Sequence, residues 1–237
     1  GWNALYLENH DHPRIISRYG SERYRTESGK MLAASYLFQC GTPCVYQGQE
    51  IGMLNNRLTS IDLYKDIMVK NNARIARKLG LPASKVLELA QKSTRDNART
   101  PMQWSDAEYA GFSTATPWFY VNSNYKEINV ESQLDDPDSL LNFYRSALLF
   151  RRDNPLVIYG RYKEYYPESK ELYVYERSYD ERRLLVVCSF TEEPVRFDAP
   201  ADYELEKGKR VFSNYEENYI ISNGFTTRPY EMRVYLF

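Results

Sequence analysis

Histidine and cysteine are both scarce in this chain of 237 residues. The only two histidines, His10 and His12, stand on either side of Asp11. The three cysteines are odd in number and include no C-x-x-C pair, which argues against a disulfide framework and favours a reducing compartment. Two histidines and one aspartate lack a clear third protein ligand, so a metal site is a weak hypothesis. We expect no metal ion, no organic cofactor and a cytoplasmic location.

The chain also lacks an excess of positive or negative charge, and it lacks long apolar runs. The 31 Lys and Arg residues are balanced by 32 Asp and Glu residues, which gives a net charge of −1. No overall basic field or polybasic tail would hold a nucleic acid or a membrane surface. No apolar run reaches the length of a membrane span, and no signal peptide is recognised. We therefore expect neither nucleic acid nor membrane as a partner.

Several common catalytic motifs are missing as well. The chain has no Gly-rich phosphate loop and no G-x-S-x-G turn. Cys40 and Cys44 flank a Gly-Thr-Pro turn, and they are predicted to be small core residues rather than nucleophiles.

The pattern that is present over the first fifty residues is strand, helix, strand. Residues 3–8 are mostly apolar and too few for a helix. A helix is predicted to open at Thr26, to carry apolar residues at helical spacing, and to stop at Gly41. Residues 43–48 form a second short apolar run. This order is typical of a βαβ unit, in which the two strands are parallel.

Helical and loop-like segments follow, and then the texture changes. Helices are predicted over 60–78, 83–92 and about 139–152, with a long ordered loop over 105–137. After residue 155 the chain consists of short β-rich runs separated by polar turns, at the spacing of an antiparallel sandwich. The sequence therefore predicts two domains, residues 1–154 and residues 155–237.

Three polar clusters are predicted to meet at one edge of the first domain. "NHD" (9–11) and "QGQE" (47–50) follow the two predicted strands, and "NART" (97–100) lies in the excursion after them. If the strands are parallel, their carboxyl ends lie on the same side, where active sites of α/β barrels are found. Arg14 and Arg18 lie near Asp11 in sequence and favour its ionised form, which suits an electrostatic stabiliser or a hydroxyl acceptor. A solvated acid paired with one of these arginines is the simpler interpretation.

Longer stretches around these clusters resemble a known family. The segments "ENHDHPRIISRYG", "GTPCVYQGQEIGM" and "RDNARTPMQW" are similar to the carboxy-terminal half of the oligo-1,6-glucosidase and α-glucosidase group of glycoside hydrolase family 13, the α-amylase family. The resemblance extends over nearly the whole chain. It implies that residues 1–154 are the last two β/α units of a (β/α)8 barrel, strands 7 and 8 with their helices and a long loop. It also implies that residues 155–237 are an antiparallel β-sandwich domain.

The same resemblance implies roles for individual residues. The family consists largely of retaining glycosidases, and Asp11 matches the carboxylate that stabilises the transition state. His10 would contact the same sugar, and Arg99 would grip the glucose at the non-reducing end. Arg14 and Glu50 are expected to support these residues without touching the sugar.

The family's nucleophile and its acid/base have no match in this chain. We therefore expect a fragment of an exo-acting α-glucosidase that acts on short α-glucoside oligosaccharides and is inactive alone. Its expected partners are the substrate and the missing amino-terminal barrel half. Because the strands would be cut from their neighbours, we expect the fragment to compensate by self-association or by rearrangement of residues 1–60.

Other functions within and outside hydrolysis stay open at this point. Trehalose-6-phosphate hydrolase, dextran glucosidase and sucrose isomerase share the family's fold. A non-catalytic domain that accompanies an amino-acid transporter is an alternative of another class.

Overall fold

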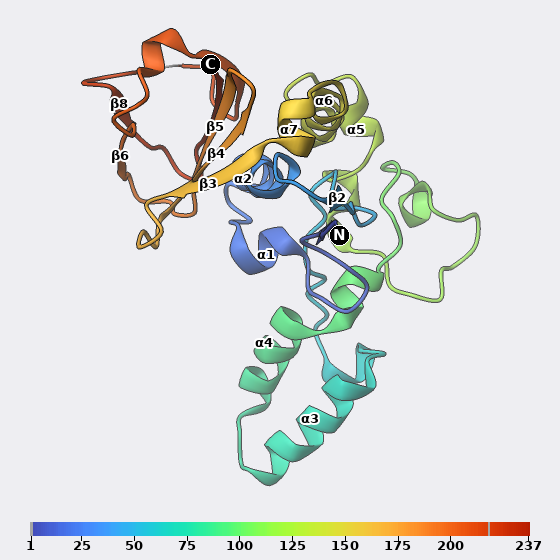
Figure 1. Ribbon diagram of the computed structural model, residues 1–237. Helices are drawn as coiled ribbons and strands as arrows, with labels where there is room; N and C mark the ends of the chain where they lie inside the picture. The colour runs from blue at the N-terminus through green and yellow to red at the C-terminus, as the bar shows by residue number, and fades with distance from the viewer. Residues whose placement is uncertain (1, 218) are drawn as a thin grey trace. The chain divides into compact units, whose positions relative to one another are not determined.

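The computed structural model describes residues 2–217 and 219–237, in two compact units (Figure 1). The first unit contains the stretch that ends at Tyr6, then Arg23–Cys44 and Asn142–Phe237. The second contains Leu7–Glu22 and Val45–Leu141. These units interleave along the sequence, whereas the predicted domains, 1–154 and 155–237, do not; that division stays a proposal about architecture.

The first unit holds two β-sheets, a short parallel strand pair and three helices. Its elements are β1 (Ala4–Leu5), α2 (Arg25–Leu37), β2 (Thr42–Pro43), most of α6 (Leu140–Asp153), α7 (Pro155–Tyr159), β3 (Arg161–Tyr165), β4 (Leu172–Tyr179), β5 (Arg182–Ser189), β6 (Arg196–Asp198), a 3-10 turn (Leu205–Lys207), β7 (Lys209–Ser213), β8 (Gly224–Thr226) and β9 (Met232–Leu236).

The predicted parallel βαβ unit is confirmed, but its strands are shorter than expected. β1 and β2 pair in parallel, with Ala4 opposite Thr42, and α2 lies between them in sequence. The predicted strand over 43–48 is wrong beyond its first residue, because the chain turns at 47–50. The predicted cap at Thr26 is also wrong: α2 begins one residue earlier, at Arg25, after a residue that makes no side-chain capping bond.

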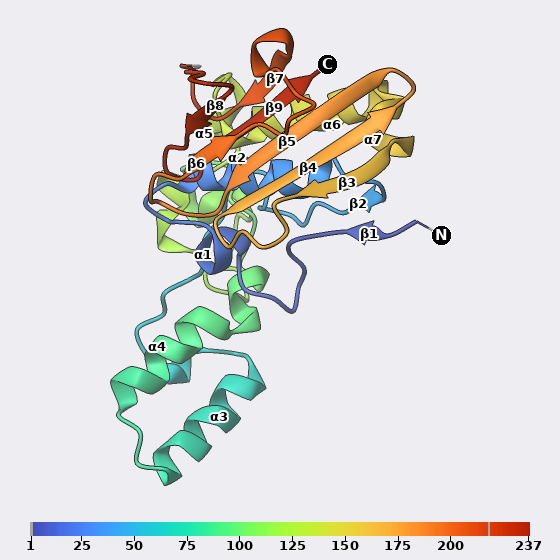
Figure 2. The same ribbon diagram turned by 60° about the vertical axis from the view of Figure 1, so that its left-hand side comes forward.

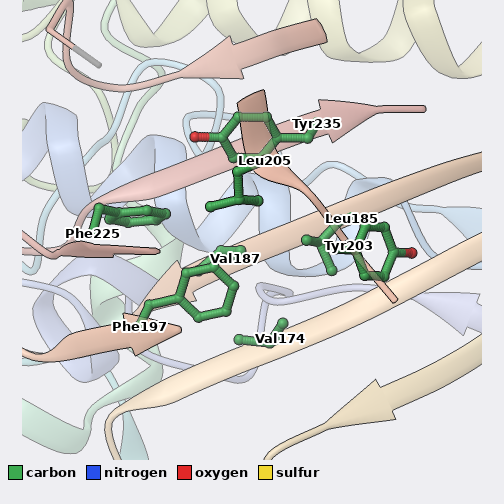
Figure 3. Close-up of a cluster of buried hydrophobic side chains, with 8 residues drawn as sticks. All are labelled: Val174, Leu185, Val187, Phe197, Tyr203, Leu205, Phe225 and Tyr235. Atoms are coloured by element: carbon green, nitrogen blue, oxygen red, sulfur yellow. The ribbon is translucent and has the colours of Figure 1, made fainter. Parts of the chain in front are cut away.

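An antiparallel sheet in the order β3-β4-β5-β9-β7 dominates the first unit. All five of these strands coincide with the predicted β-rich runs. Each face of the sheet is covered, so side chains that alternate along β4 are buried on both sides. The Tyr175 hydroxyl donates to the Ala34 carbonyl oxygen of α2 at 2.9 Å. Val174, the preceding residue, belongs to the core cluster drawn in Figure 3, and α2 lies behind β4 and β5 in Figure 2.

The second sheet, β6 paired with β8, was not anticipated from the sequence. Figure 1 shows these strands opposite β4 and β5, and Figure 3 shows the side chains that fill the space between them. The core consists of Val174, Leu185, Val187, Phe197, Tyr203, Leu205, Phe225 and Tyr235. The large antiparallel sheet and the small one thus share a single hydrophobic core.

The second unit contains helices and turns without a sheet of its own. Its elements are α1 (Ile15–Tyr19), α3 (Ile67–Lys78), α4 (Ala83–Ser93), α5 (Glu131–Leu134) and 3-10 turns at Ile61–Leu63 (η1), Arg95–Arg99 (η2), Glu108–Gly111 and Ser123–Lys126. α3 and α4 form an antiparallel hairpin (Figure 1). The single helix predicted over 60–78 is two elements, because Ser60 caps η1 and Asp66 caps α3 separately.

Two further observations bear on the sequence-based expectations. Cys40 and Cys44 are exposed, so the prediction that they are core residues is wrong; they lie on either side of the two-residue strand β2. Over the residues that the structure describes, no helix combines the length and the apolar character needed to cross a membrane.

Candidate functional site

Asp11 lies in a tight turn of the second unit. The side chain of Asn9 accepts a hydrogen bond from the backbone N–H of Asp11 at 2.8 Å, and its carbonyl oxygen accepts from the N–H of His12 at 3.3 Å. Neighbouring side chains of an extended strand would point to opposite faces. In this turn, His10 Nε2 lies 3.2 Å from Asp11 Oδ2, so both side chains can meet one ligand.

Two arginines hold the other oxygen of Asp11. Arg99 Nη2 donates to Asp11 Oδ1 at 2.8 Å, and Arg99 Nε donates to the carbonyl oxygen of His10 at 3.0 Å. Arg95 Nη1 lies 3.7 Å from the same Oδ1. The Asp11 side chain remains 49% exposed. The structure thus brings together His10, Asp11 and Arg99, with both arginines at Oδ1 of Asp11 and His10 at Oδ2.

The expected pairing of Asp11 with Arg14 or Arg18 is wrong. Arg14 is fully buried and pairs with Glu8, its Nη1 lying 3.0 Å from Glu8 Oε2. Arg18 instead lies over the ring of Tyr19. Closeness in sequence did not predict this contact. The turn at 9–12 leaves Asp11 exposed, whereas Arg14, three residues later, is buried.

Arg14 is buried and contacts residues in or next to each of the three polar clusters. Its guanidinium donates to the Gln47 carbonyl oxygen at 2.8 Å and to the Asn97 carbonyl oxygen at 3.3 Å, in addition to Glu8. Gly48 permits this packing: its φ is +89°, and a Cβ there would overlap the Met53 sulfur and lie 3.1 Å from Arg14 Nη1. Arg14 therefore fixes the ends of "NHD", "QGQE" and "NART" to one another without reaching the surface.

The two acids beneath the site have raised pKa values. Burial raises the pKa of Glu8, and the neighbouring Arg14 charge opposes that rise. Burial likewise raises the pKa of Glu50, against hydrogen bonds from backbone N–H groups and the charge of Arg14. The oxygen Oε2 of Glu50 is buried and accepts no hydrogen bond from any residue that the structure describes. Glu50 also belongs to the lining of a groove that includes Arg99.

The turn η2 carries both arginines that meet Asp11. Thr94 caps this turn through the N–H of Asp96. Asn97 is fully buried: its side-chain oxygen accepts from the N–H of Asn56 at 3.0 Å, and its amide donates to the Gln91 carbonyl oxygen at 2.9 Å. The backbone that presents Arg95 and Arg99 is thereby held on both sides.

A groove of about 510 Å³ has Arg99 in its lining. Five of its twelve lining residues are aromatic, and two of these, Trp104 and Trp118, are more than half exposed. The groove is lined by Tyr46, Gln47, Glu50, Ala98, Arg99, Thr100, Pro101, Met102, Trp104, Phe112, Trp118 and Phe119. An apolar recess of this size beside charged groups is the usual setting of a ligand site or of a surface that another segment covers.

No metal centre emerges from the arrangement. Among the residues that the structure describes, no three His, Cys, Asp or Glu side chains come together in a way that could hold a metal ion. The available chemistry is that of one oriented carboxylate, one imidazole and two guanidinium groups.

Residues 1–160 match the family model described as alpha amylase, catalytic domain, which covers more than half of the chain. The chain belongs to the alpha-amylase family. The whole length of the chain is 43% identical to the oligo-1,6-glucosidase of Halalkalibacterium halodurans, a curated relative. The chain spans 42% of that protein.

Solved structures of the family agree with this assignment. The chain superposes over its whole length on a trehalose-6-phosphate hydrolase from Bacillus licheniformis with a TM-score of 0.95 and 40% identity, and covers 43% of that structure. It also superposes on an isomaltulose synthase from Klebsiella with a TM-score of 0.92 and 36% identity, again covering 43%. The chain thus spans less than half the length of the relatives that it matches.

Sequence reasoning about the site missed Glu8, Asp66 and Arg95. Arg95 could have been predicted from the sequence, because it lies four residues before Arg99 in the same motif. Nothing in the sequence indicated that Glu8 pairs with Arg14 or that Asp66 pairs with Arg95, because tertiary packing brings these partners together.

Proposed function

We propose that this chain is the part of a retaining, exo-acting α-glucosidase that supplies the transition-state-stabilising carboxylate. The substrates would be short α-glucosides of the isomaltose type. The observation that carries the proposal is the convergence of Asp11, His10 and Arg99. Arg99 holds Oδ1 of Asp11 at 2.8 Å, His10 lies beside Oδ2, and the Asp11 side chain is half exposed.

The chemistry of this trio suits a glycosidase transition state. Hydrolysis of a glycoside passes through a species that resembles an oxocarbenium ion, whose positive charge is stabilised by a fixed carboxylate nearby. Asp11 is oriented by Arg99 before any substrate arrives, so it need not reorganise during the reaction. Arg99 and His10 can in addition bind sugar hydroxyl groups at the same ring.

The reaction also needs a nucleophile and an acid/base, two carboxyl groups about 5–5.5 Å apart. The resemblance to the family assigns neither of them to this chain. We therefore expect the 237-residue polypeptide alone not to hydrolyse p-nitrophenyl α-glucoside. Turnover by a preparation free of host enzymes would contradict this, and the partner that completes the site would be the amino-terminal barrel half.

A hybrid enzyme tests the proposal directly. The chain would replace the matching 42% of the Halalkalibacterium oligo-1,6-glucosidase, and the hybrid should hydrolyse isomaltose with retention at the anomeric carbon. Replacing Asp11 with Asn should lower kcat by about 10²–10³-fold, because one preorganised charge interaction is lost. Asp135→Asn is the matched control, since Asp135 is also an exposed aspartate of the second unit. A hybrid whose kcat is unaffected by Asp11→Asn would refute the role.

Trehalose 6-phosphate is the second candidate substrate, favoured by the likeness to trehalose-6-phosphate hydrolase. Dextran and sucrose isomerisation remain further alternatives within the family. Parallel assays with isomaltose, trehalose 6-phosphate, dextran and sucrose separate these activities. A cytoplasmic role in carbohydrate metabolism is part of the same proposal.

A further inference from the structure

Arg95 makes a second, indirect connection to the carboxylate of Asp11. Its Nε and Nη2 atoms donate to the two oxygens of Asp66 at 3.0 and 2.6 Å, a bidentate geometry. Its remaining nitrogen, Nη1, lies 3.7 Å from Asp11 Oδ1. The guanidinium plane therefore has one side bound to a buried anchor and the other side facing the candidate site.

The anchor itself cannot easily move. Asp66 is 4% exposed, and its Oδ1 caps α3 by accepting from the N–H of Met68 at 3.0 Å. Its hydrogen bonds from Arg95 lower the pKa of Asp66 to about 2, so it is ionised at neutral pH. Because Asp66 belongs to the start of a helix, the position of Arg95 is set by a rigid element rather than by a loop.

Arg95 and Arg99 act on the same oxygen of Asp11. They lie at the two ends of η2, and both approach Oδ1, while His10 Nε2 lies 3.2 Å from Oδ2. Two cations on one oxygen favour a single rotamer of the Asp11 side chain. A single rotamer in turn determines which oxygen remains for a ligand.

We propose that Arg95 is a positioning residue: anchored by Asp66, it holds Asp11 in the rotamer that leaves Oδ2 for the sugar. This inference depends on the proposed role of Asp11. The competing possibility is a purely structural role, in which Arg95 only ties η2 to α3 and has no effect on Asp11.

The 237-residue chain itself allows a direct test by NMR. Removing Arg95 alone would leave Asp66 buried without a partner, so the main variant is Arg95→Gln combined with Asp66→Asn, which keeps a capping oxygen at position 66. The three-bond couplings of Asp11 that report χ1 should show one rotamer in the parent chain and averaged values in this variant. Arg57→Gln is the matched control, because Arg57 pairs with Glu22 at 2.6 Å and is not a neighbour of Asp11. Unchanged couplings in the double variant would overturn the proposal.

The hybrid enzyme described above gives the functional readout. The double variant should lower kcat by about 10–100-fold with little change in KM, as expected when a reacting group is displaced. Arg95→Lys should retain part of the rate, since it keeps one charge near Oδ1. If Asp11→Asn abolishes activity and the double variant does not, the inference fails while the proposed function stands. If Asp11→Asn has no effect, the proposed function fails first.

Discussion

Arg14 and Glu8 form a fully buried ion pair beneath the candidate site, with their side chains 0% and 1% exposed. Such a pair contributes little net stability compared with apolar residues, but loss of one partner is costly because a buried charge is left unpaired. The main effect of the pair is to hold neighbouring segments of backbone in position. The guanidinium joins the backbone after two strands to the turn that carries Arg99.

Replacing Arg14 with Met should lower the free energy of unfolding by about 3–5 kcal/mol at neutral pH, because Glu8 is left unpaired. The folded-state pKa of Glu8 is already raised and would rise further, so protonation relieves the cost as the pH falls toward 4.5. Urea denaturation at pH 5 and pH 8 measures this difference. The double variant Glu8→Gln/Arg14→Met should recover part of the stability, and a double variant as unstable as Arg14→Met would contradict the pairing argument.

Arg99 differs from Arg14 because it is part of the exposed site. In the hybrid enzyme, Arg99→Ala should raise KM for isomaltose, since a hydroxyl-binding guanidinium is lost together with the bond that orients Asp11. Steady-state kinetics provide the measurement, with Arg57→Ala as control. An unchanged kcat/KM would exclude Arg99 as a sugar clamp.

At the scale of elements, the start of α3 controls more than a helix end. Asp66 caps the helix, pairs with Arg95 and lies next to Lys65, whose ammonium group lies over the ring of Trp118 at 5.5 Å. One short stretch thus supports both Arg95 and the aromatic wall of the groove. The helix was predicted through this point, yet the break at Tyr64–Asp66 is what places these side chains.

The hydrogen bonds from Arg95 to Asp66, together with the helix cap, make the second unit sensitive to acid. The pKa of Asp66 is lowered from 3.8 to about 2, so its contribution is present above pH 3.8 and is lost as the pH falls toward 2. We expect a loss of about 2 kcal/mol between pH 4 and pH 2 that is absent in Asp66→Asn. The difference between the two proteins in thermal unfolding across this range measures it. Parallel pH profiles would show that Asp66 is not the group responsible.

At the scale of the whole molecule, several large apolar side chains remain exposed on the second unit. Trp104, Phe112 and Trp118 around the groove are between 49% and 75% exposed. Exposed apolar surface of this kind favours association. The relatives that the chain matches are more than twice as long, so in them this face can be covered by protein that this chain does not contain.

We therefore expect the chain to self-associate. Light scattering at increasing concentration should show a mass that rises above 27.9 kDa, and Trp104→Ser/Trp118→Ser should reduce the effect. Trp2→Ser is the control, because Trp2 is an exposed tryptophan of the other unit. A monomer at every concentration would contradict this expectation.

Much of the fold was predictable because its elements are marked locally. α4, α6 and the five strands of the large sheet follow apolar periodicity and turn residues closely. β6 and β8 were missed because three-residue strands have no readable period; they exist because Phe197 and Phe225 are buried between the sheets. The strands predicted before "NHD" and "QGQE" were too long. The apolar residues continue past the point at which a turn ends the strand pairing.

The sequence by itself determined the order of the elements, the family and the presence of Asp11, His10 and Arg99, because these depend on local patterns and ordered motifs. Only the tertiary structure decided which charges meet. Asp11 contacts residues 84 and 88 positions away and not Arg14, three positions away, because a turn of four residues sends one side chain to the surface and the other into the core. Contact between charges depends on side-chain direction and packing, which spacing along the chain does not encode.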